Sequence, residues 1–261
     1  MKRIIALTFV MIFTVMAYST PTWMWIGRFN LLTITTPCGS STRNAMAQYN
    51  EFFTAAQNNH PNGPAPYENE KVLGSDVTWS TVRACSLSSS DFLFFQSHGL
   101  EDAHSMGVLT DDKKWCYWWQ PYMMRLGRYV YGTRWAYFET CELCKWHDHF
   151  WENWNDAFRG VQCIFGFAES FAGESAFFTE TIRKFWEEWT GAHGPQQTLW
   201  QAHYWSSYHG MYENGWNISP VTISSSRINS PHFFMYDTYD NATSEAGDWL
   251  AAICQYDVLI H

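Results

Sequence analysis

Three short apolar runs stand out along the chain, and each ends abruptly in small or polar residues. Runs without alternation are typical of strands covered on both faces, as in a parallel sheet. The pattern therefore predicts three central strands, over residues 91–96, 134–140 and 161–167. A further strand is predicted over residues 29–36, where β-branched residues alternate with others before Pro37.

Segments with helical spacing separate these predicted strands. The clearest amphipathic pattern covers residues 175–189, where large apolar residues fall on one stripe. Further helices are predicted over residues 44–57, 115–126, 146–158 and 198–208. Alternation of strands and helices predicts an α/β fold, a three-layer α/β/α sandwich with a mostly parallel central sheet. Asn, Pro and Gly predict a surface loop over residues 58–70.

The N-terminal segment 1–19 has the form of a secretion signal. It contains a basic start, an apolar run over residues 4–16 and a small-x-small cleavage site. That run is too short for a stable membrane-spanning helix, and no later apolar stretch is long enough. We therefore expect a secreted or periplasmic protein with no membrane span. Residues 20–261 are expected to form one domain, with a C-terminal extension from about residue 211.

Charge and aromatic content narrow the range of partners. The formal net charge is -9 and the chain has no basic stripe, which argues against a nucleic-acid partner. Aromatic residues make up 19% of the chain, including 16 Trp. Such content is typical of a thick aromatic core or of a surface that binds glycans or peptides. The core is the simpler interpretation, because these rings bury large areas.

Seven cysteines in a chain with a predicted export signal suggest disulfides, and the odd number leaves at least one thiol over. They stand at positions 38, 85, 116, 141, 144, 163 and 254. For Cys144, the simplest expectation is a structural disulfide with a distant partner such as Cys116 or Cys163.

His98 and Cys141 each lie just beyond the carboxyl end of a predicted central strand. In a parallel sheet both residues emerge at the same edge, and their side chains meet if the two strands are neighbours. A thiolate is the attacking species of a cysteine nucleophile, and an adjacent imidazole favours it. The backbone N–H groups of Gly99 and Cys141 could hold the oxyanion of a tetrahedral intermediate. The pattern predicts a nucleophilic His–Cys dyad.

These motifs carry a family resemblance. An apolar strand followed by Ser97-His98-Gly99, and then an apolar strand followed by Glu139-Thr140-Cys141, resembles the caspase-like cysteine peptidases. That group includes legumains, gingipains, clostripains, caspases and CHAT peptidases. Residues 157–189 are similar to the segment after the nucleophile in CHAT-type members, where a Gly-led strand precedes a helix. The resemblance covers roughly residues 28–210.

The resemblance implies a caspase-like fold and an exported cysteine endopeptidase that works through an acyl-enzyme intermediate. By it, His98 is the general base or acid, Cys141 is the nucleophile and the Gly99 N–H is an oxyanion donor. The implied substrate is a peptide or protein, and no cofactor or metal is expected.

Three acidic residues are further candidates for the predicted site. Glu139 and Glu169 follow neighbouring predicted strands and could line the same cleft as Cys141. Acidic walls would favour a basic residue in the substrate, although these carboxylates could equally be ion-paired. Asp102 lies in the loop after His98, where it could orient the imidazole or be an ordinary loop residue.

Two other classes of function remain open from the sequence. The segment 141–149 contains Cys141, Cys144, His147 and His149, which suits a zinc site or a Cys-x-x-Cys redox pair in residue type, although four ligands within nine residues would be cramped. A non-catalytic module on the same fold could instead bind glycan or peptide through exposed aromatic residues. That alternative predicts that Cys141 is held in a disulfide.

Overall fold

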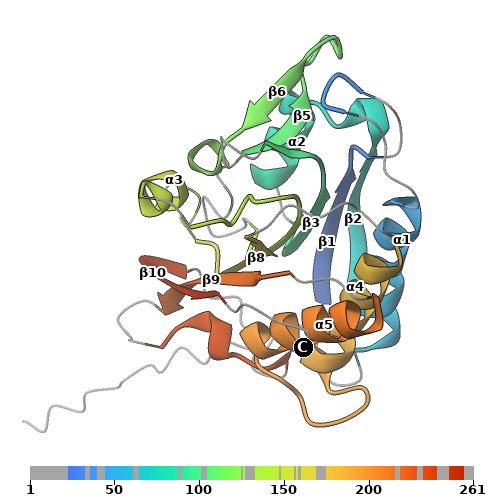
Figure 1. The fold of residues 1–261 in the computed structure, drawn as a ribbon, viewed down its shortest axis with the longest axis vertical. Coiled ribbons are helices and arrows are strands. Elements are labelled where there is room, and N and C mark those ends of the chain that lie inside the picture. Colours follow the sequence, from blue (N-terminus) through green and yellow to red (C-terminus); the bar gives the residue numbers. More distant parts are fainter. Residues whose placement is uncertain are drawn as a thin grey trace, which may run out of the picture.

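The computed structural model describes residues 23–32, 36–39, 45–60, 65–87, 90–100, 105–124, 126, 133–146, 148–155, 157, 160–168, 175–214, 218–227, 232–239 and 247–255. The predicted signal peptide, residues 1–19, lies outside these ranges. The described chain forms a seven-stranded sheet and a three-stranded sheet, and helices pack on the larger one (Figure 1). The prediction of a mixed α/β fold with a mostly parallel central sheet is confirmed.

The larger sheet contains the three strands predicted from the apolar runs. Its strands are β1 (Trp23–Asn30), β2 (Ala65–Leu73), β3 (Phe92–Gln96), β7 (Trp135–Glu139), β8 (Cys163–Phe167), β9 (Pro220–Arg227) and β10 (Gly247–Gln255). In the order β10-β9-β8-β7-β3-β1-β2, the strands from β8 to β2 run parallel, whereas β9 runs antiparallel to both of its neighbours, β8 and β10. Every residue of β3, β7 and β8 is buried, as expected of strands covered on both faces.

Three long helices share one hydrophobic cluster with alternate residues of the central strands: α1 (Ala45–Asn58), α4 (Ser175–Thr190) and α5 (Leu199–Asn214). The ring of Phe52 in α1 stacks on Phe94 at 4.3 Å, and Trp186 in α4 lies 5.2 Å from Phe92. The predicted aromatic core is confirmed, because the largest fully buried side chains include Trp119, Trp135, Trp154, Trp186 and Trp189.

The opposite side chains of the central strands belong to a second cluster. It is completed by Val82 of α2 (Trp79–Leu87), Trp154 of α3 (Phe150–Asn155) and Trp119 of β6 (Cys116–Trp119). The smaller sheet has the order β4-β5-β6, with β4 (Gly99–Leu100), β5 (Ser105–Leu109) and β6 (Cys116–Trp119) antiparallel. Short 3-10 helices occupy Gly74–Asp76, Pro121–Met123 and Phe234–Tyr236. None of the helices in the described ranges is long and apolar enough to cross a membrane.

The bounds predicted for the first strand, residues 29–36, are wrong, and residues 33–35 lie outside the described ranges. The strand is β1, and it ends at Asn30. The side-chain Oδ1 of Asn30 accepts a hydrogen bond from the Leu32 N–H at 2.8 Å, a local turn that takes the chain out of the sheet.

Two further predictions of element type are wrong. The segment 58–70 was predicted as a loop, but β2 begins at Ala65 and pairs in parallel with β1 as an edge strand, where polar residues are tolerated. The helix predicted over residues 115–126 is instead strand β6 followed by a 3-10 turn, because β6 pairs with β5 along its length. The helix predicted over 146–158 is confirmed only within Phe150–Asn155.

Candidate active site

Neighbouring strands bring His98 and Cys141 to one edge of the main sheet. Strands β3 and β7 pair in parallel, with Gln96 in register with Glu139. His98 follows Gln96 by two residues, and Cys141 follows Glu139 by two residues. The Ser97 N–H donates to the Glu139 carbonyl at 3.4 Å, so the pairing continues beyond the end of both strands. The two residues therefore emerge beside each other at the carboxyl edge, where parallel sheets present their ligand sites.

Gly99 brings the two segments into direct contact. A Cβ atom added to Gly99 would lie 2.0 Å from the carbonyl oxygen of Cys141 and 3.1 Å from its backbone nitrogen. No real Cβ lies 2.0 Å from an oxygen atom, so the backbone after His98 packs on the backbone of Cys141 only because residue 99 is glycine. This places the predicted oxyanion residues, Gly99 and Cys141, against each other.

Cys141 itself is partly exposed and is one of the described cysteines that form no disulfide. The non-catalytic alternative expected this residue to be held in a disulfide. The next residue, Glu142, has a φ of 52°, in the left-handed region that costs a non-glycine residue about 1 kcal/mol. Its side chain is buried, and its carboxylate pairs with Lys145 Nζ at 3.1 Å. A strained backbone directly after a partly exposed thiol is typical of functional sites.

A buried polar network lies at the ends of β3 and β7. The side-chain Nε2 of Gln96 donates to Glu139 Oε2 at 2.6 Å and to Gln48 Oε1 of α1 at 2.7 Å. Glu139 is only 4% exposed. Burial raises the pKa of the Glu139 carboxyl well above its ordinary value, although the hydrogen bond from Gln96 acts in the opposite direction. This network fixes the ends of β3 and β7 to each other and to α1.

The raised pKa of Glu139 predicts a pH-dependent stability. Because the folded state holds this proton more tightly than the unfolded state, stability is full below the ordinary carboxyl pKa and falls as the pH rises through the raised value. In Glu139→Gln the side-chain carbonyl oxygen can still accept the hydrogen bond from Gln96, but the titratable carboxyl group is gone. We expect the gain in stability of the variant over the natural protein to increase as the pH rises from about 4 to about 8.

Denaturant unfolding midpoints at several pH values check this prediction. The buried Asp91, whose pKa burial also raises, is present in both proteins and cancels in the comparison. A difference in stability that does not vary with pH would contradict the prediction.

Cys144 does not form the disulfide expected of it. Cys116 pairs with Cys38 instead, while Cys144 and Cys163 are buried thiols. Cys144 packs against β8, since a Cβ atom added to Gly166 would lie 2.5 Å from its sulfur. Burial raises the pKa of the Cys144 thiol, which makes it a poor nucleophile and a poor ligand.

The metal and redox alternatives gain no support from this geometry. Cys144 is fully buried, whereas the side chain of His149 is 72% exposed and contacts Glu152 at 3.0 Å. Within the described ranges, no group of three or more His, Cys, Asp or Glu side chains is arranged to hold a metal ion. His147 lies outside those ranges.

The contact between Gly166 and Cys144 predicts a specific suppressor. Gly166→Ala should lower the free energy of unfolding by about 1–3 kcal/mol, because the added methyl group overlaps the Cys144 sulfur. Combining it with Cys144→Ala removes the overlap, so the double variant should be more stable than the sum of the single effects predicts. Gly194→Ala is the control for glycine replacement, since nothing lies within 4 Å of its added Cβ. Additive effects in the double-mutant cycle would contradict the predicted overlap.

Two of the predicted site residues, Asp102 and Glu169, lie outside the described residues. Gly39 and Gln96 are among the residues that contact the site and were not predicted. Gly39 packs on the His98 ring, and Gln96 binds Glu139. Gln96 had a signal in the sequence, because a polar residue ends an otherwise apolar run immediately before the dyad motif. Gly39 had no such signal in the sequence, because its position beside His98 depends on the tertiary fold.

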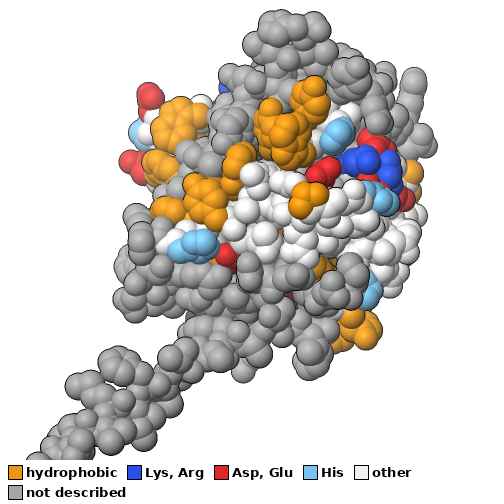
Figure 2. Space-filling model, turned by 90° about the horizontal axis from the view of Figure 1, so that it is seen from below, with side chains coloured by type: hydrophobic (Ala, Val, Ile, Leu, Met, Phe, Trp, Pro, Cys, Tyr) orange, Lys and Arg blue, Asp and Glu red, His pale blue; other side chains and the backbone are white. Residues whose placement is uncertain are grey.

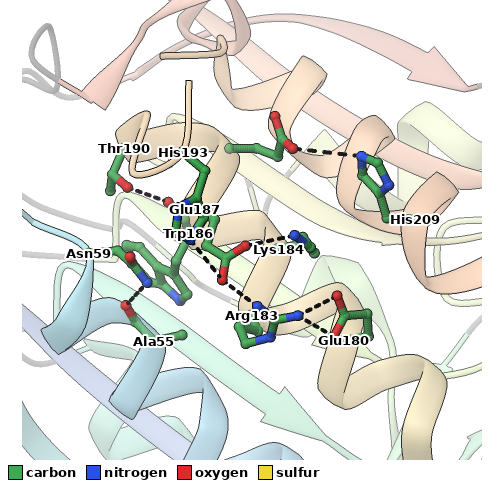
Figure 3. Close-up of polar contacts among 11 residues, drawn as sticks. Ala55, Asn59, Glu180, Arg183, Lys184, Trp186, Glu187, Thr190, His193 and His209 are labelled. Atoms are coloured by element: carbon green, nitrogen blue, oxygen red, sulfur yellow. Dashed lines mark hydrogen bonds and ion pairs between the residues drawn. The ribbon is translucent and has the colours of Figure 1, made fainter. Parts of the chain in front are cut away.

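A cavity of about 220 Å³ lies away from the dyad motifs, at the end of α4, and is lined by Lys184, Glu187, Glu188, His193, Gly194, Pro195 and Gln197. Figure 3 shows the ion pairs around it. The Glu187 carboxylate pairs with Arg183 Nη1 at 2.5 Å and with Lys184 Nζ at 3.0 Å. Because two cations already neutralise this buried carboxylate, the cluster is a stabilising network between turns of one helix and does not resemble a ligand site.

Some exposed aromatic rings lie in pairs, namely Trp25 with Tyr67 at 5.5 Å and Trp146 with Trp151 at 6.0 Å. Large hydrophobic side chains that are exposed include Trp25, Trp115, Trp146, Trp151 and Trp205. On the face drawn in Figure 2, the hydrophobic side chains of the described residues form several separate patches.

Comparison with known proteins gives no relative from which a function could be transferred. No protein-family model matches the chain, and no curated protein matches it.

Proposed function

We propose that the protein is a cysteine hydrolase of peptide bonds, with His98 as general base and acid and Cys141 as nucleophile. The observation that carries the proposal is the register of β3 and β7, which delivers a histidine and a partly exposed thiol to the same edge at the same distance beyond neighbouring strands. The close approach of Gly99 to the Cys141 backbone and the left-handed Glu142 support it. The three-layer, caspase-like architecture is part of this proposal.

The chemistry follows from the residues. His98 accepts the proton of the Cys141 thiol, and the thiolate sulfur attacks the carbonyl carbon of the scissile peptide bond. The N–H groups of Gly99 and Cys141 stabilise the oxyanion that forms. His98 then gives its proton to the leaving amine, and the acyl-enzyme remains on Cys141. Water, deprotonated by His98, hydrolyses the thioester and restores the thiol.

An extracellular setting is part of the same proposal. The segment 1–19 would direct export, and the Cys38–Cys116 disulfide is compatible with an oxidising compartment outside the cell. The acidic net charge argues against a nucleic-acid substrate, and the proposed substrate is a peptide or protein.

Trapping the acyl-enzyme tests the proposal. The protein is mixed with a set of blocked fluorogenic peptides that differ in the residue before the scissile bond, quenched in acid and digested. Mass spectrometry should find the acyl group of a cleaved peptide on the fragment that contains Cys141. In His98→Ala this adduct should form much more slowly. Cleavage without an adduct on Cys141, or no cleavage of any peptide in the set, would refute the assignment.

A further inference from the structure

Gly39 lies directly against the imidazole of His98. A Cβ atom added to Gly39 would be 2.7 Å from both Cδ2 and Nε2 of the ring, a distance that no side chain accepts. The φ of Gly39 is 140°, which L residues rarely adopt. Steric fit and backbone conformation therefore both require glycine here, and the ring of His98 rests on the Gly39 backbone.

The backbone of His98 is held by a second segment. The Gly107 N–H of β5 donates to the His98 carbonyl oxygen at 2.8 Å, and the Ser97 hydroxyl donates to the Gly107 carbonyl oxygen. Gly107 in turn faces the disulfide, because a Cβ atom added there would lie 3.0 Å from Cys38 Sγ and 3.2 Å from Cys116 Sγ.

One covalent link joins these two segments. Thr36 and Gly39 exchange two backbone hydrogen bonds, at 2.8 and 3.0 Å, which close a tight turn with Cys38 inside it. The disulfide from Cys38 ties this turn to β6, 78 residues further along the chain. Strand β6 pairs with β5, which carries Gly107. The disulfide thus connects the residue that contacts the His98 ring to the strand that binds the His98 backbone.

We propose that the Cys38–Cys116 disulfide and Gly39 position the His98 imidazole for the dyad, so that reduction of this disulfide weakens the reactivity of Cys141. A dithiol supplies two electrons and two protons in that reduction, leaving thiols at Cys38 and Cys116 and a cyclic disulfide as the oxidised reagent. Gly39 is a positioning residue, since it acts through His98. The proposal rests on the proposed function, because a dyad must exist for its geometry to matter.

Two variants and one control test the proposal. Gly39→Ala introduces the clashing methyl group, and the double variant Cys38→Ser with Cys116→Ser removes the link. Gly191→Ala is the matched control, because Gly191 also has a positive φ, of 72°, and its added Cβ would lie 2.9 Å from the Gly194 carbonyl oxygen, at the end of α4. For each protein, the alkylation rate of Cys141 by iodoacetamide is measured across pH, and the His98 ring signals are followed by NMR with labelled histidine.

We expect both test variants to shift the NMR signals of the His98 ring and to slow Cys141 alkylation by about ten- to a hundredfold, as small misplacements of catalytic groups do. Gly191→Ala should lose stability but keep the natural rate. Unchanged His98 signals and rates in both folded test variants would overturn the proposal. If His98 signals shift while Cys141 is unreactive even in the natural protein, the positioning contact stands and the proposed function fails. If the variants do not fold, the folded natural protein is reduced with a dithiol and the same two measurements are made. Unchanged His98 signals and an unchanged Cys141 alkylation rate after reduction would then overturn the proposal.

Discussion

Cys141→Ala is expected to abolish peptide hydrolysis, reducing kcat/KM by roughly a thousandfold or more, as loss of a nucleophile does in enzymes that form acyl intermediates. The reason is chemical, because the methyl group that replaces the thiol cannot attack a carbonyl carbon. Hydrolysis of the best peptide from the trapping experiment is the measurement. Circular dichroism and the denaturation midpoint establish that the variant is folded.

Cys144→Ala is the matched control for this experiment. The sulfur of Cys144 is fully buried against β8, and burial raises the pKa of this thiol. Loss of the thiol should therefore change stability but leave kcat/KM within a few-fold of the natural value. If Cys141→Ala retained full activity, or if Cys144→Ala were the variant that lost it, the assignment of the nucleophile would be wrong.

Trp186→Ala is expected to lower the free energy of unfolding by about 3–5 kcal/mol, the usual cost of truncating a fully buried aromatic ring. The indole lies between α1 and the main sheet, 5.4 Å from the Phe52 ring and 5.2 Å from the Phe92 ring. Since small domains are stable by only about 5–15 kcal/mol, a loss of this size should lower the denaturant midpoint markedly.

Trp115→Ala removes an equally large side chain that is 69% exposed. Its cost should stay within about 0.5 kcal/mol, as for surface substitutions. Similar costs for the two replacements would show that the aromatic cluster between the helices and the sheet does not hold the fold together.

The central part of the fold was predictable because burial on both faces leaves a strong pattern. Strands β3, β7 and β8 are apolar throughout and end in polar residues, so their limits could be predicted to within about two residues. The positions of His98 and Cys141 relative to the strand ends followed from these limits. The helix α4 was predicted almost to the residue, because large apolar side chains recur on one of its faces.

The first strand was harder to predict because a charge is buried within it. Arg28 of β1 is only 3% exposed, forms an ion pair with Glu68 of β2 and donates to the Tyr49 carbonyl oxygen of α1 at 2.7 Å. An arginine inside a run normally argues against a buried strand. Its partners are distant in the sequence, so the pattern favoured the later, β-branched segment instead.

The surroundings of His98 could not be predicted either, because they depend on contacts between residues that are distant in the sequence. The pairing of Cys38 with Cys116 cannot be deduced from cysteine positions, and the contact of Gly39 with the His98 ring depends on that pairing. The smaller sheet was missed because β5 and β6 are stabilised mainly by pairing with each other and by packing on the main sheet.

Thiol labelling tests the central claim, the His98–Cys141 dyad, most directly. The folded protein is treated with a limiting amount of iodoacetamide at about pH 6, where an unassisted thiol is mostly protonated, and the alkylated peptides are counted by mass spectrometry. The account predicts that Cys141 is labelled first, that the buried Cys144 and Cys163 remain unlabelled, and that His98→Ala slows the labelling of Cys141 by roughly a hundredfold. Equal labelling rates of Cys141 in the natural protein and in folded His98→Ala would contradict the dyad.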